Sequence, residues 1–332
     1  MGLKKVIASV KRNRRFLLTT HTNPEGDALG STLAFYRLLK KLGKEAEVIS
    51  DDVIPRGYEF LPDIDKIKRF RSCPGKKNNS AGDIKFDCLV ALDCSDLARC
   101  GQVARVNTAN KPIINVDHHI SNGKFGQINW VEPGTSSCSE MIYKLYKAMG
   151  VALDRKAALL LYTGILTDTG SFRYSNTGSF THRAISELLK YKLDVVRIYK
   201  SVYEDIPFVD MQLLSRILPD MRSCARGRII WFQIVRKILK DKRLSFDLSE
   251  HVLSFARAVK GVEVVVLFKE NLGVKNEIRV NLRSQGKVDV NKIAKFFGGG
   301  GHKTASGITI SGMLLEVRKK VLAKIQQAIK KM

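Results

Sequence analysis

Short hydrophobic runs alternate with segments of helical spacing along the first third of the chain. The segments of strand length are residues 16–21, 88–93 and 112–117, and residues 45–50 are predicted as a further strand. Residues 27–42 instead place apolar side chains three or four positions apart, which predicts a helix that ends at Gly43. Strands that alternate with helices indicate an α/β fold whose parallel sheet is covered on both faces.

The pattern changes in the middle of the chain and then returns to strands. Residues 136–218 have almost entirely helical spacing, and residues 157–166 are apolar nearly all round, which predicts a buried helix. A second α/β unit begins near Arg228. Its predicted strands are residues 229–235, 262–268, 278–282 and 307–310, and its predicted helices are residues 249–259, 289–297 and a closing segment to Met332.

A chain of 332 residues is long enough for two hydrophobic cores. Proline and glycine interrupt the pattern between residues 205 and 227, and a polar loop is predicted at residues 72–83. We therefore expect a first domain at residues 1–205 and a smaller second domain at residues 221–332. A helical linker is expected at about residues 190–220.

Composition narrows the class of protein. Hydrophobic residues make up 44% of the chain, and no run of about 18 apolar residues suits a membrane span or signal peptide. We therefore expect a cytoplasmic protein without a membrane partner. The six cysteines are scattered without a C-x-x-C pair, which argues against a zinc site or a disulfide framework.

The formal net charge of +25 favours phosphate-rich partners. The basic residues are nevertheless spread along the chain without a long single-sign tract. A general basic bias of the surface explains the charge as well as nucleic-acid binding does.

Acids and histidines follow several of the predicted strands. His21, Glu25 and Asp27 come directly after the first strand, in a turn shaped by proline and glycine. Since ligands bind beyond the carboxyl ends of parallel strands, all three could bind a metal ion. The alternative is a strand-to-helix turn in which Asp27 caps the helix and Glu25 is exposed.

Two further clusters of acids and histidines end predicted strands, and a single acid follows a predicted helix. Asp93 ends one apolar strand, and Asp117, His118 and His119 end another. A helix cap and a solvated turn are the alternatives for these two clusters. Asp168 follows the predicted buried helix, where an unpaired carboxylate at a helix C-terminus is unfavourable. Either a metal ion or Arg173 could relieve that cost. Carboxylates and imidazoles gathered in this way suit two divalent ions.

A glycine-rich segment stands in the second unit. The four glycines 298–301 precede His302, and their backbone N–H groups could approach a phosphate closely. A flexible linker is the alternative. Arg279 and Arg283 lie four apart on a predicted strand and therefore on one face, where either a phosphate or solvent could be the partner.

These residues occur in an order that resembles the DHH family of phosphoesterases, over nearly the whole chain. The match is to the bacterial type that is both an oligoribonuclease for very short RNA (nanoRNA) and a 3′,5′-bisphosphonucleoside (pAp) phosphatase. The segments that carry the resemblance are HTNPEGDALGS, ALDCSD, NVDHHISN, TDTGSFRY and VNLRSQGKVDVNKIAKFFGGGGHKTASG.

The resemblance implies a DHH domain and a DHH-associated domain with the active-site cleft between them, and two manganese ions. His21, Glu25 and Asp93 would bind one ion, and the other would be bound by Asp27, Asp93, His118 and Asp168. His119 would face the substrate phosphate as a catalytic residue, and Asp117 would orient its neighbours. The implied substrate-binding residues are Arg283, Gly299, Gly300, Gly301 and His302.

One position departs from the family, whose first motif usually has aspartate where this chain has Glu25. Glutamate keeps the charge and adds a methylene, so it can still bind a metal or hold it through water. Magnesium or cobalt in place of manganese also fits these ligands.

The resemblance implies hydrolysis of short oligoribonucleotides to 5′-mononucleotides, and of pAp to AMP and phosphate. The sequence is also compatible with two other functions. The chain could hydrolyse linear or cyclic dinucleotides such as pApA, pGpG or cyclic di-AMP, or it could be a non-catalytic basic RNA-binding protein. A homodimer is compatible with the sequence, which does not determine the oligomeric state.

Overall fold

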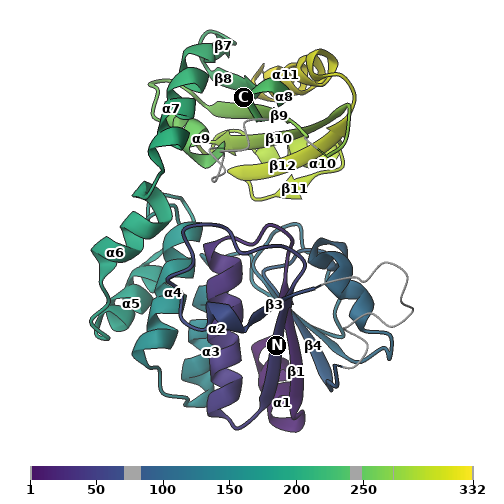
Figure 1. Ribbon diagram of the computed structural model, residues 1–332, viewed down its shortest axis with the longest axis vertical. Helices are drawn as coiled ribbons and strands as arrows, with labels where there is room; N and C mark the ends of the chain where they lie inside the picture. The colour runs from purple at the N-terminus through teal and green to yellow at the C-terminus, as the bar shows by residue number, and fades with distance from the viewer. Residues whose placement is uncertain (1, 71–83, 240–248, 272, 331–332) are drawn as a thin grey trace. The chain divides into compact units, whose positions relative to one another are not determined.

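A computed structural model describes residues 2–70, 84–239, 249–271 and 273–330 (Figure 1). The chain forms two compact units, residues 1–205 and residues 206–332. The polar loop predicted at residues 72–83 lies outside the described residues. Among the residues that the structure describes, no helix combines the length and the apolar character needed to cross a bilayer.

A six-stranded parallel sheet forms the centre of the first unit, as the alternation of strands and helices predicts. Its strands, in spatial order, are β3 (Ile67–Arg69), β2 (Glu45–Ser50), β1 (Arg15–Thr20), β4 (Cys88–Leu92), β5 (Ile113–Asp117) and β6 (Ile128–Val131). The edge strands β3 and β6 were not expected from the sequence. Both are short and only partly buried, so neither has a hydrophobic run of its own.

Alternate side chains of the central strands enter two separate cores. Phe16 and Leu18 of β1 pack with the helices on one face, while Leu17 between them packs on the other. The helices of the first unit are α1 (Gly2–Arg12), α2 (Gly26–Lys41), α3 (Cys138–Met149), α4 (Arg155–Asp168), α5 (Ser179–Leu189) and α6 (Val195–Tyr199). The opposite face is covered in part by the 3-10 segment η2 (Leu97–Val106), which contributes Val103. The sheet is therefore covered on both faces.

The buried helix predicted at residues 157–166 lies within α4, most of whose apolar side chains are inaccessible to solvent. Short helical segments complete the chain up to the second sheet: η1 (Ile64–Lys66), η3 (Lys200–Glu204), α7 (Phe208–Ile217) and η4 (Leu218–Asp220).

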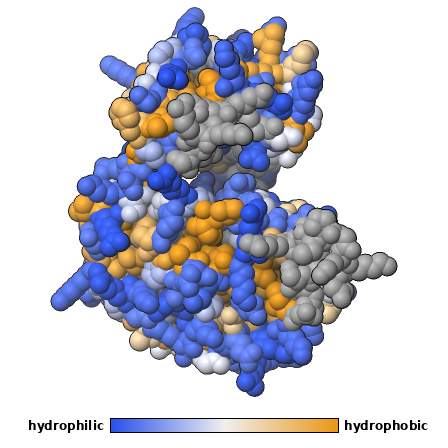
Figure 2. Space-filling view, viewed as in Figure 1, coloured by the Kyte–Doolittle hydropathy of each residue, from blue (hydrophilic) through white to orange (hydrophobic). Residues whose placement is uncertain are grey.

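The second unit contains a mixed sheet in which β8 and β9 are parallel and the other neighbours antiparallel. The spatial order is β11 (Gly300–Gly301), β12 (Ala305–Ser311), β10 (Glu277–Ser284), β9 (Val264–Glu270), β8 (Ile229–Ile234) and β7 (Arg222–Cys224). Helices α10 (Val290–Phe296) and α11 (Leu314–Lys330) share one core with this sheet, and α7 and α9 (Ser249–Arg257) share the other. Helix α8 (Arg236–Leu239) follows β8. On the face shown in Figure 2, hydrophilic residues cover most of each unit.

Candidate metal centre

Three neighbouring strands of the first sheet end in acids or histidines. His21 directly follows β1, Asp93 directly follows β4, and Asp117 is the last residue of β5, followed by His118 and His119. Since β4 lies between β1 and β5 and all three are parallel, their carboxyl ends bring these side chains to one edge of the sheet.

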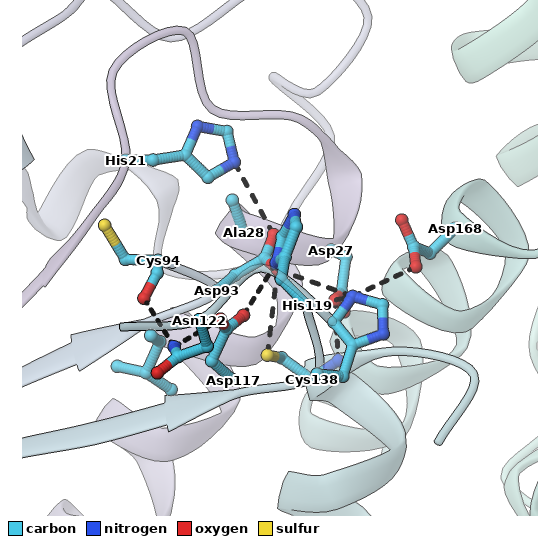
Figure 3. A network of polar contacts seen from close by, with 12 residues as sticks. His21, Asp27, Ala28, Asp93, Cys94, Asp117, His119, Asn122, Cys138 and Asp168 are labelled. Atoms are coloured by element: carbon cyan, nitrogen blue, oxygen red, sulfur yellow. Dashed lines mark hydrogen bonds and ion pairs between the residues drawn. The ribbon is translucent and has the colours of Figure 1, made fainter. Parts of the chain in front are cut away.

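Asp93 occupies the middle of this group and is buried (Figure 3). Its Oδ2 lies 3.5 Å from Nε2 of His21. Its other oxygen, Oδ1, lies 3.6 Å from Nε2 of His118 and 3.5 Å from Nδ1 of His119. The backbone of Asp93 has a φ of 54°, a left-handed conformation that ends the strand at this residue. The two carboxylate oxygens therefore face different histidines.

Asp27 joins the group from the first turn of α2, where it is buried. Its two oxygens accept hydrogen bonds from the backbone N–H groups of Cys138 (2.7 Å) and Ser139 (2.8 Å), at the start of α3. Oδ2 also lies 3.9 Å from Nε2 of His118. Asp27 thus satisfies the N-terminus of α3 rather than capping its own helix, and a carboxylate has lone pairs left for a cation.

Glu25 occupies the N-cap position of α2 and is exposed, and its side chain makes no capping hydrogen bond. That exposure matches the alternative interpretation of the turn. Burial raises the pKa of Asp168, His118 lowers it, and the negative charges of Asp27, Asp93 and Glu25 raise it. The charge of Glu25 therefore still acts on Asp168. Glu25 therefore lies at the rim of the group, within electrostatic reach of Asp168.

Asp168 is the last residue of α4, and its Oδ2 lies 3.2 Å from Nε2 of His118. Arg173, the alternative partner, instead donates from Nε to the backbone oxygen of Gly170 (2.8 Å). In Figure 3, Asp168 and His21 lie on opposite sides of Asp93.

Asp117 holds its neighbours in place. His119 donates from Nδ1 to Oδ1 of Asp117 (2.7 Å), and Asn122 donates from Nδ2 to Oδ2 (2.6 Å). Burial raises the pKa of Asp117, but His119 and Asn122 lower it, and the pKa lies below its usual value. Asp117 is therefore ionised, and it fixes the ring of His119.

Two further residues touch this centre, Cys138 and Asn176, and neither was expected from the sequence. The Sγ atom of Cys138 lies 3.7 Å from Oδ1 of Asp93, and burial with nearby aspartates keeps the pKa of the thiol well above its usual value. Asn176 donates from Nδ2 to the backbone oxygens of Ser136 (2.9 Å) and Asp168 (3.0 Å). Neither residue follows a predicted strand, so no sequence signal marked them.

The donor set fits divalent cations. Ligand atoms of Asp27, Asp93, His118 and Cys138 all lie within 4.8 Å of one another, and all four residues are buried. Burial and the charge of Asp93 raise the pKa of Asp27 to about 6, which reflects the cost of placing several carboxylates together. Burial opposes ionisation of Asp93 as well, but the three histidines hold its pKa well below the usual range. A cation would relieve the repulsion among these acids.

Metal binding to this centre is expected to release protons. Burial lowers the pKa of His118, but Asp168, Asp93 and Asp27 raise it to about 9, so the imidazole is protonated at neutral pH. A metal ligand must be deprotonated, and the pKa of Asp168 is raised as well, so at about pH 7.5 binding should expel at least one proton and affinity should rise with pH. Calorimetric titration with Mn²⁺ in buffers of different ionisation enthalpy measures this number. An enthalpy that does not depend on the buffer would contradict it.

In the second unit, the glycine-rich segment is an ordered edge strand rather than a flexible linker. Gly300 and Gly301 of β11 pair with Gly307 and Ser306 of β12. The next residue, His302, donates its backbone N–H to Ala305, which is also the β12 partner of Arg283. The sheet therefore places Arg283 and His302 on either side of one β12 residue. Arg279 and Arg283 share a face, as their spacing predicts.

Substitution of Gly299 by alanine is expected to destabilise this edge of the second unit. A Cβ at Gly299 would lie 2.2 Å from the backbone oxygen of Gly307, a contact that only backbone movement can relieve. Overpacking of this kind costs about 1–3 kcal/mol. Calorimetric unfolding should show the loss, whereas Gly307→Ala, whose Cβ meets nothing within 4 Å, should unfold like the original protein. Equal stability of the two variants would contradict the close approach.

Comparison with known proteins gives matches to both units. Residues 15–165 match the N-terminal domain of the DHH family, and residues 233–331 match the DHHA1 domain. The bifunctional oligoribonuclease and PAP phosphatase NrnA of Thermus thermophilus is 32% identical over 299 residues, which cover 90% of this chain and 85% of that protein. The protein of the same name from Bacillus subtilis is 27% identical over 309 residues, covering 92% of each chain.

A solved structure is also similar over almost its whole length. The crystal structure of an exopolyphosphatase-related protein from Bacteroides fragilis has a TM-score of 0.86 and 25% sequence identity. The likeness covers 99% of this chain and 97% of that chain.

Proposed function

The chain belongs to the DHH family, and from that premise we propose that it is a manganese-dependent phosphoesterase with two metal ions. Its substrates in this proposal are short oligoribonucleotides, hydrolysed to 5′-mononucleotides, and pAp, hydrolysed to AMP and phosphate. The names of the relatives from Thermus and Bacillus, each an oligoribonuclease and PAP phosphatase, support this choice of substrates.

The main support for this proposal is the position of Asp93. A carboxylate whose two oxygens face different histidines is suited to bridge two cations. We assign His21, Glu25 and Asp93 to one ion, and Asp27, Asp93, His118 and Asp168 to the other. Glu25 is the exposed member of its set, so it binds either directly after a small movement of the turn or through water.

Bound cations would lower the pKa of a water molecule and polarise the phosphoryl oxygens. The chain's own residues position the substrate around them. Asp117 accepts from Nδ1 of His119 and so fixes the orientation of the ring, which we assign to contact with the substrate phosphate. In the second unit, we assign substrate binding to Arg283, Gly299, Gly300, Gly301 and His302.

The choice of manganese rests on the ligands. Carboxylate oxygens with imidazole nitrogens suit manganese, and magnesium and cobalt are the alternatives to be compared with it. The protein needs no membrane partner for this activity, and we propose that it acts in the cytoplasm.

The test is a substrate panel with the purified protein. The substrates are pAp, a diribonucleotide, pApA, pGpG, cyclic di-AMP and a long RNA, each incubated with Mn²⁺, Mg²⁺ or Co²⁺ and analysed by product chromatography. We expect AMP from pAp and mononucleotides from the short RNAs, with the fastest turnover in Mn²⁺. Turnover of cyclic di-AMP alone would replace the proposal with a signalling phosphodiesterase. Salt-dependent binding of long RNA without hydrolysis of any substrate would identify a non-catalytic RNA-binding protein.

A further inference from the structure

Arg99 lies beside the metal centre in a turn that is tied to the ligand loop. The backbone oxygen of Arg99 accepts a hydrogen bond from the backbone N–H of Thr22 (2.7 Å), the residue after His21. The turn itself begins at Asp96, whose side chain accepts from the backbone N–H of Ala98 (2.7 Å). Arg99 therefore has a fixed place at the His21 side of the centre.

The turn directs the side chain of Arg99 outward. The next residue, Cys100, is buried, and its Sγ lies 3.3 Å from the Sγ of Cys94, which directly follows Asp93. Arg99 is exposed, in contrast to the buried His21 and Asp93. Burial lowers the pKa of His21, and Asp93 raises it above the usual value. The positive charge of Arg99 lowers the same pKa, so this charge acts on the His21 side of the centre.

Arg99 has no carboxylate partner among the described residues, unlike two arginines of the first unit that are held in close ion pairs. Arg15 forms an ion pair with Asp87 (2.8 Å), and Arg37 forms one with Asp154 (2.9 Å). Over the part of the chain that the structure describes, no acid pairs with the Arg99 guanidinium. An arginine without a carboxylate partner, beside a site proposed to act on phosphate esters, is available for a planar, two-point contact with a phosphate.

Resting on the proposed function, we propose that Arg99 binds the terminal 5′-phosphate of the substrate, the phosphomonoester that is not hydrolysed. The reacting phosphate would lie among buried groups, whereas Arg99 is at the rim, so it contacts a phosphate one position away. The preferred substrates are then nucleotides with a second phosphate, namely 3′,5′-bisphosphates and 5′-phosphorylated dinucleotides.

Paired substrates that differ only in the 5′-phosphate test this assignment. They are pAp against adenosine 3′-phosphate, and pApA against ApA, with KM and kcat measured for Arg99→Gln and Arg99→Lys. For pAp and pApA we expect Arg99→Gln to raise KM by about tenfold to hundredfold, with kcat changed by less than about threefold and a smaller loss in Arg99→Lys. For the two substrates without the 5′-phosphate, KM should stay the same.

The matched control is Arg105→Gln, an exposed arginine of the same 3-10 segment beyond Gly101, which should leave all four KM values unchanged. An equal rise of KM for substrates with and without the 5′-phosphate would overturn the assignment, as would no rise at all.

Binding measured without turnover separates this inference from the proposed activity. Dissociation constants of pAp and adenosine 3′-phosphate are measured by calorimetry with Ca²⁺ in place of Mn²⁺. If the original protein hydrolyses nothing, the proposed function fails, while a selective loss of pAp binding in Arg99→Gln would still support the Arg99 site. Unchanged pAp binding in that variant would refute it.

Discussion

Replacement of Asp93 by asparagine is expected to lower kcat/KM for pAp and for a diribonucleotide by about 10³-fold or more. Asparagine keeps the shape of the side chain but removes its charge, and only one oxygen remains for the two sets of ligands. A bound metal supplies several kcal/mol of transition-state stabilisation, and each ~1.36 kcal/mol corresponds to tenfold in rate. Initial rates measured across a range of Mn²⁺ concentrations provide the test.

The control is Asp87→Asn, at the opposite end of the same strand. Asp87 directly precedes β4, pairs with Arg15 and has its pKa lowered to about 2 by that pair. Its loss should reduce stability slightly, as for other partly exposed ion pairs, and leave the rates unchanged. If Asp93→Asn kept the original rates at saturating Mn²⁺, the bridging role would be wrong.

The first sheet could be predicted because its central strands are buried on both sides. Residues 16–18 and 88–92 are continuous hydrophobic runs, since successive side chains such as Phe16 and Leu17 enter different cores. The edge strands β3 and β6 could not be predicted. They contact the sheet on one side only, so Ile67–Arg69 has no pattern to separate it from a loop.

The grouping of the candidate metal ligands could be predicted for a related reason. In a parallel sheet, residues that end adjacent strands must lie at one edge, so His21, Asp93 and Asp117 were identifiable without coordinates. The contact of Asp27 with the start of α3 depends on how two helices pack, over a separation of 111 residues. Cys138 reaches Asp93 for the same reason, and no local spacing contains that information.

Asp27 and Asp168 are expected to respond to different extents to the same substitution in the metal-free protein. Asp27 accepts two backbone hydrogen bonds, whereas asparagine has one acceptor oxygen and would place an NH₂ group against an N–H donor. Leaving a buried donor without a partner costs about 1–3 kcal/mol. Asparagine also removes a buried charge that costs stability, because burial and Asp93 raise the pKa of Asp27 to about 6. These two effects oppose each other, so Asp27→Asn should abolish turnover and leave the metal-free protein with a lower Tm than Asp168→Asn does.

Asp168→Asn should abolish turnover as well, yet raise the Tm of the metal-free protein by about 2–4 °C. Burial and neighbouring acids raise the pKa of Asp168 in the folded state, so this residue costs stability at neutral pH, and asparagine removes that cost. The pH dependence of this gain in stability tests its sign. An acid with a raised folded pKa destabilises increasingly as pH rises, so the gain should be present at about pH 7 and disappear toward about pH 4, near the unfolded pKa of about 3.9. Calorimetry of both variants with and without Mn²⁺ measures these shifts. A fall in Tm for both would show that Asp168 supports the metal-free fold, and its main partner would then be His118 rather than a cation.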